Sequence, residues 1–287
     1  MVNLAWRHMK VYFRDPWAVF FSFLSTVIIL VLFVVFLNEN QQQALPEGLR
    51  GTNEGAYLVY SWILSGVLLV GMVTTPLGVL GMMVSDLESK AIHDFYVAPL
   101  KRRTVVFSYL IAALTVTLMF GFVNLGVGLA ILYFVSGYTL PLSSLGLVVV
   151  LMIVTAFLFS SLFYYLVSFI KTNSAHGAMS TLTGTLIGFF AGIYVPVGVF
   201  GRGLNTFLGS LPFMQGAALM RNLYMDDAIR VVFGQALSQA DQYRRVFGLQ
   251  IVWGNVGFSN TTVWLLLLAW TLVFLSLSLV KITKFKL

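Results

Sequence analysis

Long stretches of this chain contain no Asp, Glu, Lys or Arg, and this distribution limits the fold more than any motif does. The uncharged stretches are 16–38, 55–85, 104–170, 172–201 and 246–280. Only 9% of the residues are charged, whereas soluble domains carry roughly 25%. A helix needs about 20 apolar residues to cross a bilayer, and 104–170 holds two such lengths around a turn-rich segment at 136–141. The sequence therefore predicts an all-α polytopic membrane protein.

Six transmembrane helices are expected from these stretches. We place them at 17–37, 57–84, 105–135, 145–170, 178–200 and 262–280. The first apolar run lacks the small-residue cleavage site of a signal peptide, so we expect it to remain as a helix. The whole chain, 1–287, then forms a single transmembrane domain.

The positions of Lys and Arg predict the orientation of these helices. With the N-terminus in the cytoplasm, 11 of the 17 Lys and Arg residues fall in inner segments, and both termini are cytoplasmic. The net charge of +7 is typical of a protein that anchors to anionic lipid, and we expect no nucleic-acid partner. The chain has no cysteine and therefore no disulfide.

Residues 1–15 have the pattern of a helix that lies in the membrane interface. Val2, Trp6, Met9 and Phe13 share one face, and a set of basic side chains shares another. Such a helix lies in the headgroup plane with its apolar side toward the acyl chains. The candidate interface residues are Trp6, Arg7, Lys10, Phe13 and Arg14. An ordinary basic flank of the first span is the alternative.

The segment 85–104 is a charged island that predicts its own short helix. Ser85 followed by Glu88 is a capping box, and Asp86 adds a negative charge at the expected helix N-terminus. One apolar side is expected from Leu87, Ala91 and Phe95, with Ile92 at its edge. Pro99 should end this helix, and the basic cluster 101–103 follows. A membrane chain that builds such a helix at its surface offers it to a partner.

Small residues recur at four-residue spacing in the expected fifth span. Ser180, Gly184, Gly188 and Gly192 form this stripe, which suits close packing against another helix in lipid. Packing within the chain is one interpretation. A subunit interface or a wall of a transport pathway is the other.

The segment 201–261 is expected to be an external helical region. Its uncharged part, 203–220, contains Asn205, Gly209, Pro212 and Gln215, which favour an external or partly dipping hairpin over a spanning helix. If this part did span, the C-terminus would change sides. The Lys and Arg distribution permits either arrangement.

The chain lacks the common catalytic and energy-coupling motifs. It has no phosphate-binding loop, no H-E-x-x-H and no His/Cys cluster with metal spacing, so we expect no metal, no cofactor and no enzyme activity in this chain. No expected span contains a charged residue, although ion-coupled transporters usually keep such residues there. Energy for any transport would then come from a partner at the inner face, for which 85–104 is the expected docking element.

Three motifs in order resemble the membrane permease subunits of ABC-2-type exporters. The sequence 13–16 reads Phe-Arg-Asp-Pro before the first span, and Asp86-Leu87-Glu88 through Pro99 follows the second. Leu211-Pro212 followed by residues 218–221 resembles the external helix region of that family. The family often has Gly early in the coupling helix, where this chain has Ser89 and Lys90.

The resemblance implies a half-transporter in the cell membrane. A second permease subunit, identical or different, would complete the pathway, and separate ABC ATPase subunits would bind ATP and Mg²⁺. The coupling residues would be Asp86, Leu87, Glu88, Ala91, Ile92, Asp94 and Phe95. In such exporters the first, second and fifth spans line the route, which would place Gly184, Gly188 and Gly192 near it.

The cargo implied by the resemblance is amphipathic: a drug, a lipid, a peptide or a polyketide-like compound, as in multidrug efflux. The competing hypothesis is a transporter or channel that works without ATP, or a membrane scaffold. A membrane enzyme is a third and weaker interpretation, because the chain offers no catalytic constellation.

Overall fold

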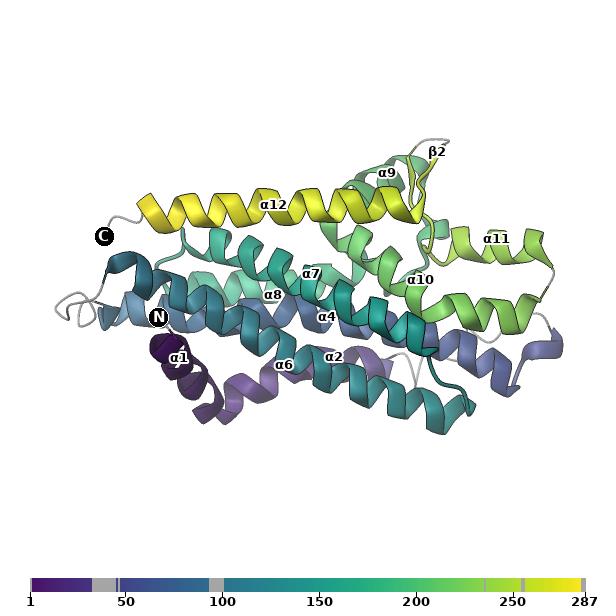
Figure 1. Cartoon of the computed structure of the whole chain (residues 1–287), viewed down its shortest axis with the longest axis horizontal. Helices are drawn as coiled ribbons and strands as arrows, with labels where there is room; N and C mark the ends of the chain where they lie inside the picture. The colour runs from purple at the N-terminus through teal and green to yellow at the C-terminus, as the bar shows by residue number, and fades with distance from the viewer. Residues whose placement is uncertain are drawn as a thin grey trace.

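The fold was analysed in a computed structural model, which describes residues 2–32, 45, 47–92, 101–234, 236–253 and 256–284. The elements in chain order are α1 (Val2–Arg14), α2 (Pro16–Leu32), η2 (Glu47–Leu49), α4 (Asn53–Glu88), α6 (Arg102–Ser136), α7 (Leu142–Val167), α8 (Asn173–Phe190), η3 (Val197–Val199), α9 (Arg202–Ser210), α10 (Pro212–Phe233), α11 (Leu237–Val246), β1 (Val252–Trp253), β2 (Val256–Gly257) and α12 (Asn260–Lys284). Long helices lie side by side in an elongated bundle (Figure 1).

Helix α4 is the centre of the bundle. It contacts α2, α6, α7, α8 and α10, and most of its 36 residues are buried. At about 1.5 Å per residue, a helix of this length is about 54 Å long, which exceeds the roughly 30 Å of a bilayer core. Pro76 lies inside it, and the preceding Thr74 hydroxyl donates to the carbonyl of Val70 at 3.0 Å. Helix α4 therefore connects the two ends of the bundle as one element.

The two ends of the bundle are each held by polar contacts. At one end lie α1, the C-terminal ends of α4 and α12, and the N-terminal ends of α6 and α8 (Figure 1); we call this the α1 end. There the backbone N–H of Asn173 donates to Glu88 at 3.0 Å. At the opposite end, the α11 end, the Tyr57 hydroxyl donates to Asp227 at 3.1 Å. Segments far apart in sequence thus meet at both ends.

Four of the six predicted spans coincide with helices that could cross a membrane. Helices α4, α6, α7 and α12 are long and apolar enough to cross a membrane, and they coincide with the predictions at 57–84, 105–135, 145–170 and 262–280. Helix α2 has 17 described residues and is not among them, and the remainder of its predicted span, 33–37, lies outside the described residues. Helix α8 is not among them either.

The predicted fifth span, 178–200, is wrong in its second half. Helix α8 ends at Phe190, and Gly192 has a φ of +60°, a left-handed conformation that glycine adopts without steric cost. The N–H groups of Ile193 and Tyr194 then bond back to the carbonyl of Gly188, at 2.7 and 3.1 Å. The chain therefore turns after α8 where the sequence pattern had suggested a continuing helix.

The region 201–261 is helical, and part of it lies within the bundle. Helices α9 and α10 meet at Leu211, and α10 packs against α4, α7 and α12 with 14 buried residues. Pro212 is the first residue of α10, a position where a missing N–H costs no helical hydrogen bond. A short antiparallel pair of strands, β1 and β2, leads into α12. Helix α10 is not among the candidate spans.

Candidate functional site

The predicted coupling helix does not begin at Ser85. Ser85, Asp86, Leu87 and Glu88 are the last turn of α4, and Ser89 is its C-cap. Lys90 has a φ of +62°, so the helix is interrupted there and Ser85 is not an N-cap. The capping-box prediction is therefore wrong, because the apolar face of span 2 continues into this segment and keeps it helical. Leu87 and Ala91 do not share one helix face.

The side chains of this segment contact other helices at the α1 end. Asp86 accepts a hydrogen bond from the Tyr109 hydroxyl in α6 at 2.5 Å. Glu88 accepts from the backbone N–H and the side-chain amide of Asn173, at the first residue of α8. Ile92 is 1% exposed and is covered within the chain. Asp94 and Phe95 lie outside the described residues. The segment thus joins α4 to both α6 and α8.

Helix α1 presents the interface side chains that the sequence indicated. Trp6 is 57% exposed, Phe13 is 41% exposed, and Arg7, Lys10 and Arg14 are exposed as well. The ammonium of Lys10 lies 5.6 Å from the ring centroid of Trp6. Ala5, His8 and Tyr12 form a buried third face against α6, which the sequence analysis did not identify. Helix α1 therefore has one side packed on the bundle and another exposed.

His8 is the polar centre of that buried face. Its Nε2 lies 2.9 Å from the Ser108 hydroxyl, and its ring stacks on Tyr109 with centroids 3.9 Å apart. Burial, together with the positive charge of Arg7, lowers the pKa of His8 to about 4. His8 is therefore neutral at neutral pH.

The small-residue stripe of α8 divides into three different environments. A Cβ added at Gly184 would meet no atom of the described residues within 4 Å. A methyl group at Gly188 would overlap the ring of Tyr194 in the same chain. Gly192 lies in the turn beyond the helix. Of the predicted pathway or interface glycines, the structure leaves Gly184 alone on an open face.

An apolar pocket lies between α7, α8 and α12. Its volume is about 290 Å³, and the tip of the α9–α10 hairpin closes one side. Aromatic rings form much of the wall: Phe190 and Phe213 lie with centroids 6.1 Å apart, and Trp270 stacks on Phe274 at 5.6 Å. Thr183 is the polar residue in the lining. Such a pocket suits a hydrocarbon or aromatic group.

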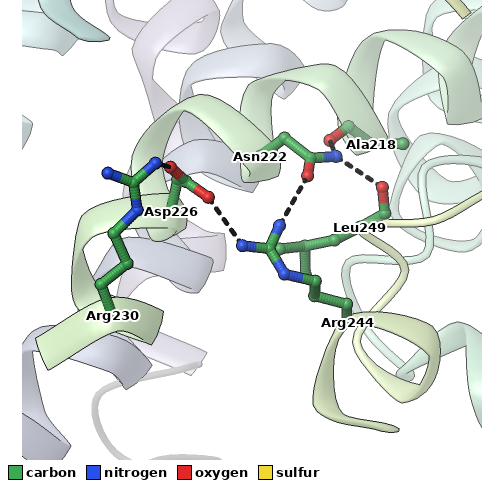
Figure 2. Close-up of polar contacts among 6 residues, drawn as sticks. All are labelled: Ala218, Asn222, Asp226, Arg230, Arg244 and Leu249. Atoms are coloured by element: carbon green, nitrogen blue, oxygen red, sulfur yellow. Dashed lines mark hydrogen bonds and ion pairs between the residues drawn. The ribbon is translucent and has the colours of Figure 1, made fainter. Parts of the chain in front are cut away.

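A polar cluster at the α11 end joins α10 to α11. Figure 2 shows Arg244 between Asn222 and Asp226, with the guanidinium 3.3 Å from the Asn222 amide oxygen and 2.6 Å from the Asp226 carboxylate. Asp226 also pairs with Arg230 at 2.6 Å. The Asn222 amide donates to the carbonyls of Ala218 and Leu249, at 2.8 and 2.5 Å. Both carboxylate oxygens of Asp226 accept from arginine side chains of the same chain, so we interpret the cluster as one that stabilises the fold.

Comparison with known families identifies one match. The profile described as "ABC-2 family transporter protein" matches residues 40–280. A comparison with curated proteins finds no match. The matched range includes α4 through most of α12, and so contains the segment after α4, the open face of α8 and the apolar pocket.

Proposed function

Because the chain belongs to the ABC-2 family of transporter proteins, we propose that it is the permease subunit of an ATP-driven exporter for an amphipathic substrate, coupled to a separate ATPase subunit. The family match over 40–280 is the observation that carries this proposal. The chain is a membrane component, and its four candidate spans agree with that role. We further propose the cell membrane as its location, with both termini in the cytoplasm.

The ATPase is proposed to bind at the α1 end, around the segment that follows α4. A force applied to this segment would act directly on α4, because Asp86 and Glu88 belong to its last turn. The bonds of Asp86 to Tyr109 and of Glu88 to Asn173 would carry the displacement to α6 and α8. The basic residues Arg7, Lys10 and Arg14 lie at the same end, as expected for the cytoplasmic side.

A second permease subunit is proposed to face α8. Thr181 and Thr185 are exposed on this helix, and their hydroxyls donate to the carbonyls of Gly177 and Thr181. Helix α8 is less apolar than the four candidate spans. Small and hydroxyl-bearing faces in a membrane usually pack against another helix or face a polar pathway. A second subunit packed over Gly184 would cover both the small residue and the exposed threonines of this helix.

The apolar part of the substrate is proposed to enter the pocket between α7, α8 and α12. Aromatic contacts hold its walls, because Phe190 packs at a tilt on Phe213 and Trp270 stacks on Phe274, so the pocket is pre-formed. Two of these three helices, α7 and α12, are candidate spans, and we propose that the pocket opens toward the acyl chains. A substrate with an apolar body could reach the pocket from the bilayer.

The test is co-purification of the full chain with a co-expressed ABC ATPase, followed by ATP hydrolysis in lipid nanodiscs. Phe95→Asp should abolish the stimulation of hydrolysis by an amphipathic dye while membrane insertion is retained. Leu142→Asp is the matched control, because Leu142 is 83% exposed at the first residue of α7. Unchanged hydrolysis in Phe95→Asp would contradict the coupling assignment. Dye movement in liposomes without ATP would favour an ATP-independent transporter.

A further inference from the structure

Arg221 is a buried cation in the middle of α10. It is 1% exposed, and no Asp or Glu among the described residues lies within ion-pair distance of it. A buried charge is costly unless other groups compensate it. The proposed function does not use this residue, so its position needs another explanation.

The two terminal nitrogens of the guanidinium bind carbonyl groups at two helix ends, whereas Nε has no hydrogen-bond partner among the described residues. Its Nη2 donates to Ala191 and Gly192 at 2.7 Å each, just after α8, and its Nη1 donates to Gly248 at 3.3 Å, just after α11. The last carbonyls of a helix lack intrahelical partners and carry partial negative charge. One arginine therefore caps the C-terminal ends of two helices.

Helix α4 takes part in the same cluster through Trp62. The Arg221 guanidinium lies 5.4 Å from the Trp62 ring centroid, and the indole N–H donates to the carbonyl of Phe247 at 3.0 Å. The packing leaves no spare room: a methyl group at Gly248 would lie 2.7 Å from Nη1 of Arg221. We call Trp62, Ala191, Gly192, Arg221 and Gly248 the Arg221 cluster.

The two ends of α8 are held very differently. The end at Gly192 is fixed by the buried bonds of the Arg221 cluster. The other end is held to α4 by the exposed bond between Asn173 and Glu88 and by the half-buried contact between His176 and the carbonyl of Leu77 at 3.0 Å. Exposed hydrogen bonds exchange readily with water, whereas buried charged ones do not.

We propose that Arg221 is a positioning residue for transport, which fixes the Gly192 end of α8 to α4, α10 and α11 so that α8 moves through its Asn173 end. This inference rests on the proposed function, because movement of α8 serves transport only if the chain is a permease. The anchoring itself is a property of the resting chain and can be measured without an ATPase.

The experiment uses pairs of spin labels on the full chain in lipid nanodiscs. The chain has no cysteine, so introduced cysteines are the sole labelling sites. One pair, at Phe189 and Val231, measures the distance between the Gly192 end of α8 and α10. Both side chains are exposed. The second pair, at Ala178 and Val11, reports on the Asn173 end against α1.

At rest, Arg221→Met should broaden the Phe189–Val231 distance distribution and leave the Ala178–Val11 distribution unchanged. Arg221→Lys should keep the first distribution narrow, because one ammonium can occupy the Nη2 position between the two α8 carbonyls. Arg230→Met is the control and should change neither, since Arg230 lies on the surface with a side chain 75% exposed. An unchanged Phe189–Val231 distribution in folded Arg221→Met would overturn the proposal. If that variant does not fold, Arg221→Gln takes its place, and an unchanged Phe189–Val231 distribution in it would overturn the proposal equally.

During ATP turnover with a co-expressed ATPase, the Ala178–Val11 distance should shift in the wild-type chain and the Phe189–Val231 distance should not. An equal shift at both ends would overturn the positioning role. If no ATPase binds, the proposed function fails, while the resting distributions still decide whether Arg221 anchors α8.

Discussion

The ring of His8 in α1 stacks on the ring of Tyr109 in α6, with a centroid separation of 3.9 Å and an angle of 24° between the planes. Tyr109 in turn donates to Asp86 at the end of α4. The interface helix is therefore linked to the proposed coupling segment through two aromatic side chains.

The docking of α1 should depend on pH through His8. Because burial lowers the pKa of His8 to about 4, the unfolded chain binds the proton more readily than the folded one. This contribution to stability is present above the ordinary histidine pKa of 6.5 and is lost as the pH falls toward 4. Thermal unfolding of the wild-type chain and of His8→Gln should diverge over that window, with the wild-type chain losing more. Parallel pH profiles would exclude this role.

Replacement of Lys90 by glycine should stabilise the chain. Lys90 has a φ of +62°, and a left-handed conformation costs a non-glycine residue roughly 1–2 kcal/mol. The expected gain is about 1 kcal/mol in the free energy of unfolding, because glycine also loses more entropy on folding. Thermal unfolding in detergent measures it. Lys101→Gly is the control and should give no gain, since Lys101 has a φ of −67°.

Gly184 faces open space and Gly188 is packed against Tyr194, so alanine substitution should change the stability of the chain in opposite directions at the two positions. Gly188→Ala should destabilise the chain by about 1–3 kcal/mol, because the methyl group must displace the ring of Tyr194. Gly184→Ala should stabilise the chain by about 0.5–1 kcal/mol, because alanine loses less conformational entropy than glycine inside a helix and its methyl group has room. A bulky Gly184→Trp should reduce transport without lowering the melting temperature. Full transport in that variant would argue against a pathway or subunit interface at Gly184.

The indole of Trp62 should contribute through its hydrogen bond. Trp62→Phe keeps a ring near Arg221 but leaves the buried carbonyl of Phe247 without its donor, a loss worth about 1–3 kcal/mol. Equilibrium unfolding in denaturant measures the difference. Trp17→Phe provides the comparison, because Trp17 is 68% exposed and its replacement should have little effect.

Filling the apolar pocket should impair transport of an amphipathic dye. Thr183 lines the pocket, and a Trp at this position would occupy much of its 290 Å³. We expect Thr183→Trp to lower dye transport by reconstituted complexes with little change in thermal stability. Leu142→Trp adds bulk at an exposed position outside the pocket and serves as the comparison. Equal loss in both variants would remove the pocket from the pathway.

The prediction that a new helix begins at Ser85 was wrong for a specific reason. Ser85 and Glu88 satisfy the spacing of a capping box, but Val84 and Leu87 continue the packed face of α4, and that packing kept the segment helical. Similarly, the four-residue spacing of Gly184, Gly188 and Gly192 extended past the point where α8 ends. Periodicity shows which residues could share a face, and it does not show where a turn interrupts the helix.

The sequence by itself determined the membrane class of this protein and the places of four spans, because lipid excludes charge and leaves a backbone no partner except its own helix. The tertiary structure alone decided which polar side chains meet. His8 and Ser108 are 100 residues apart, and Trp62 and Phe247 are 185 apart. No local pattern specifies such pairs, because they depend on how whole helices pack. The buried role of Arg221 follows from that packing, since its acceptors come from the ends of two other helices.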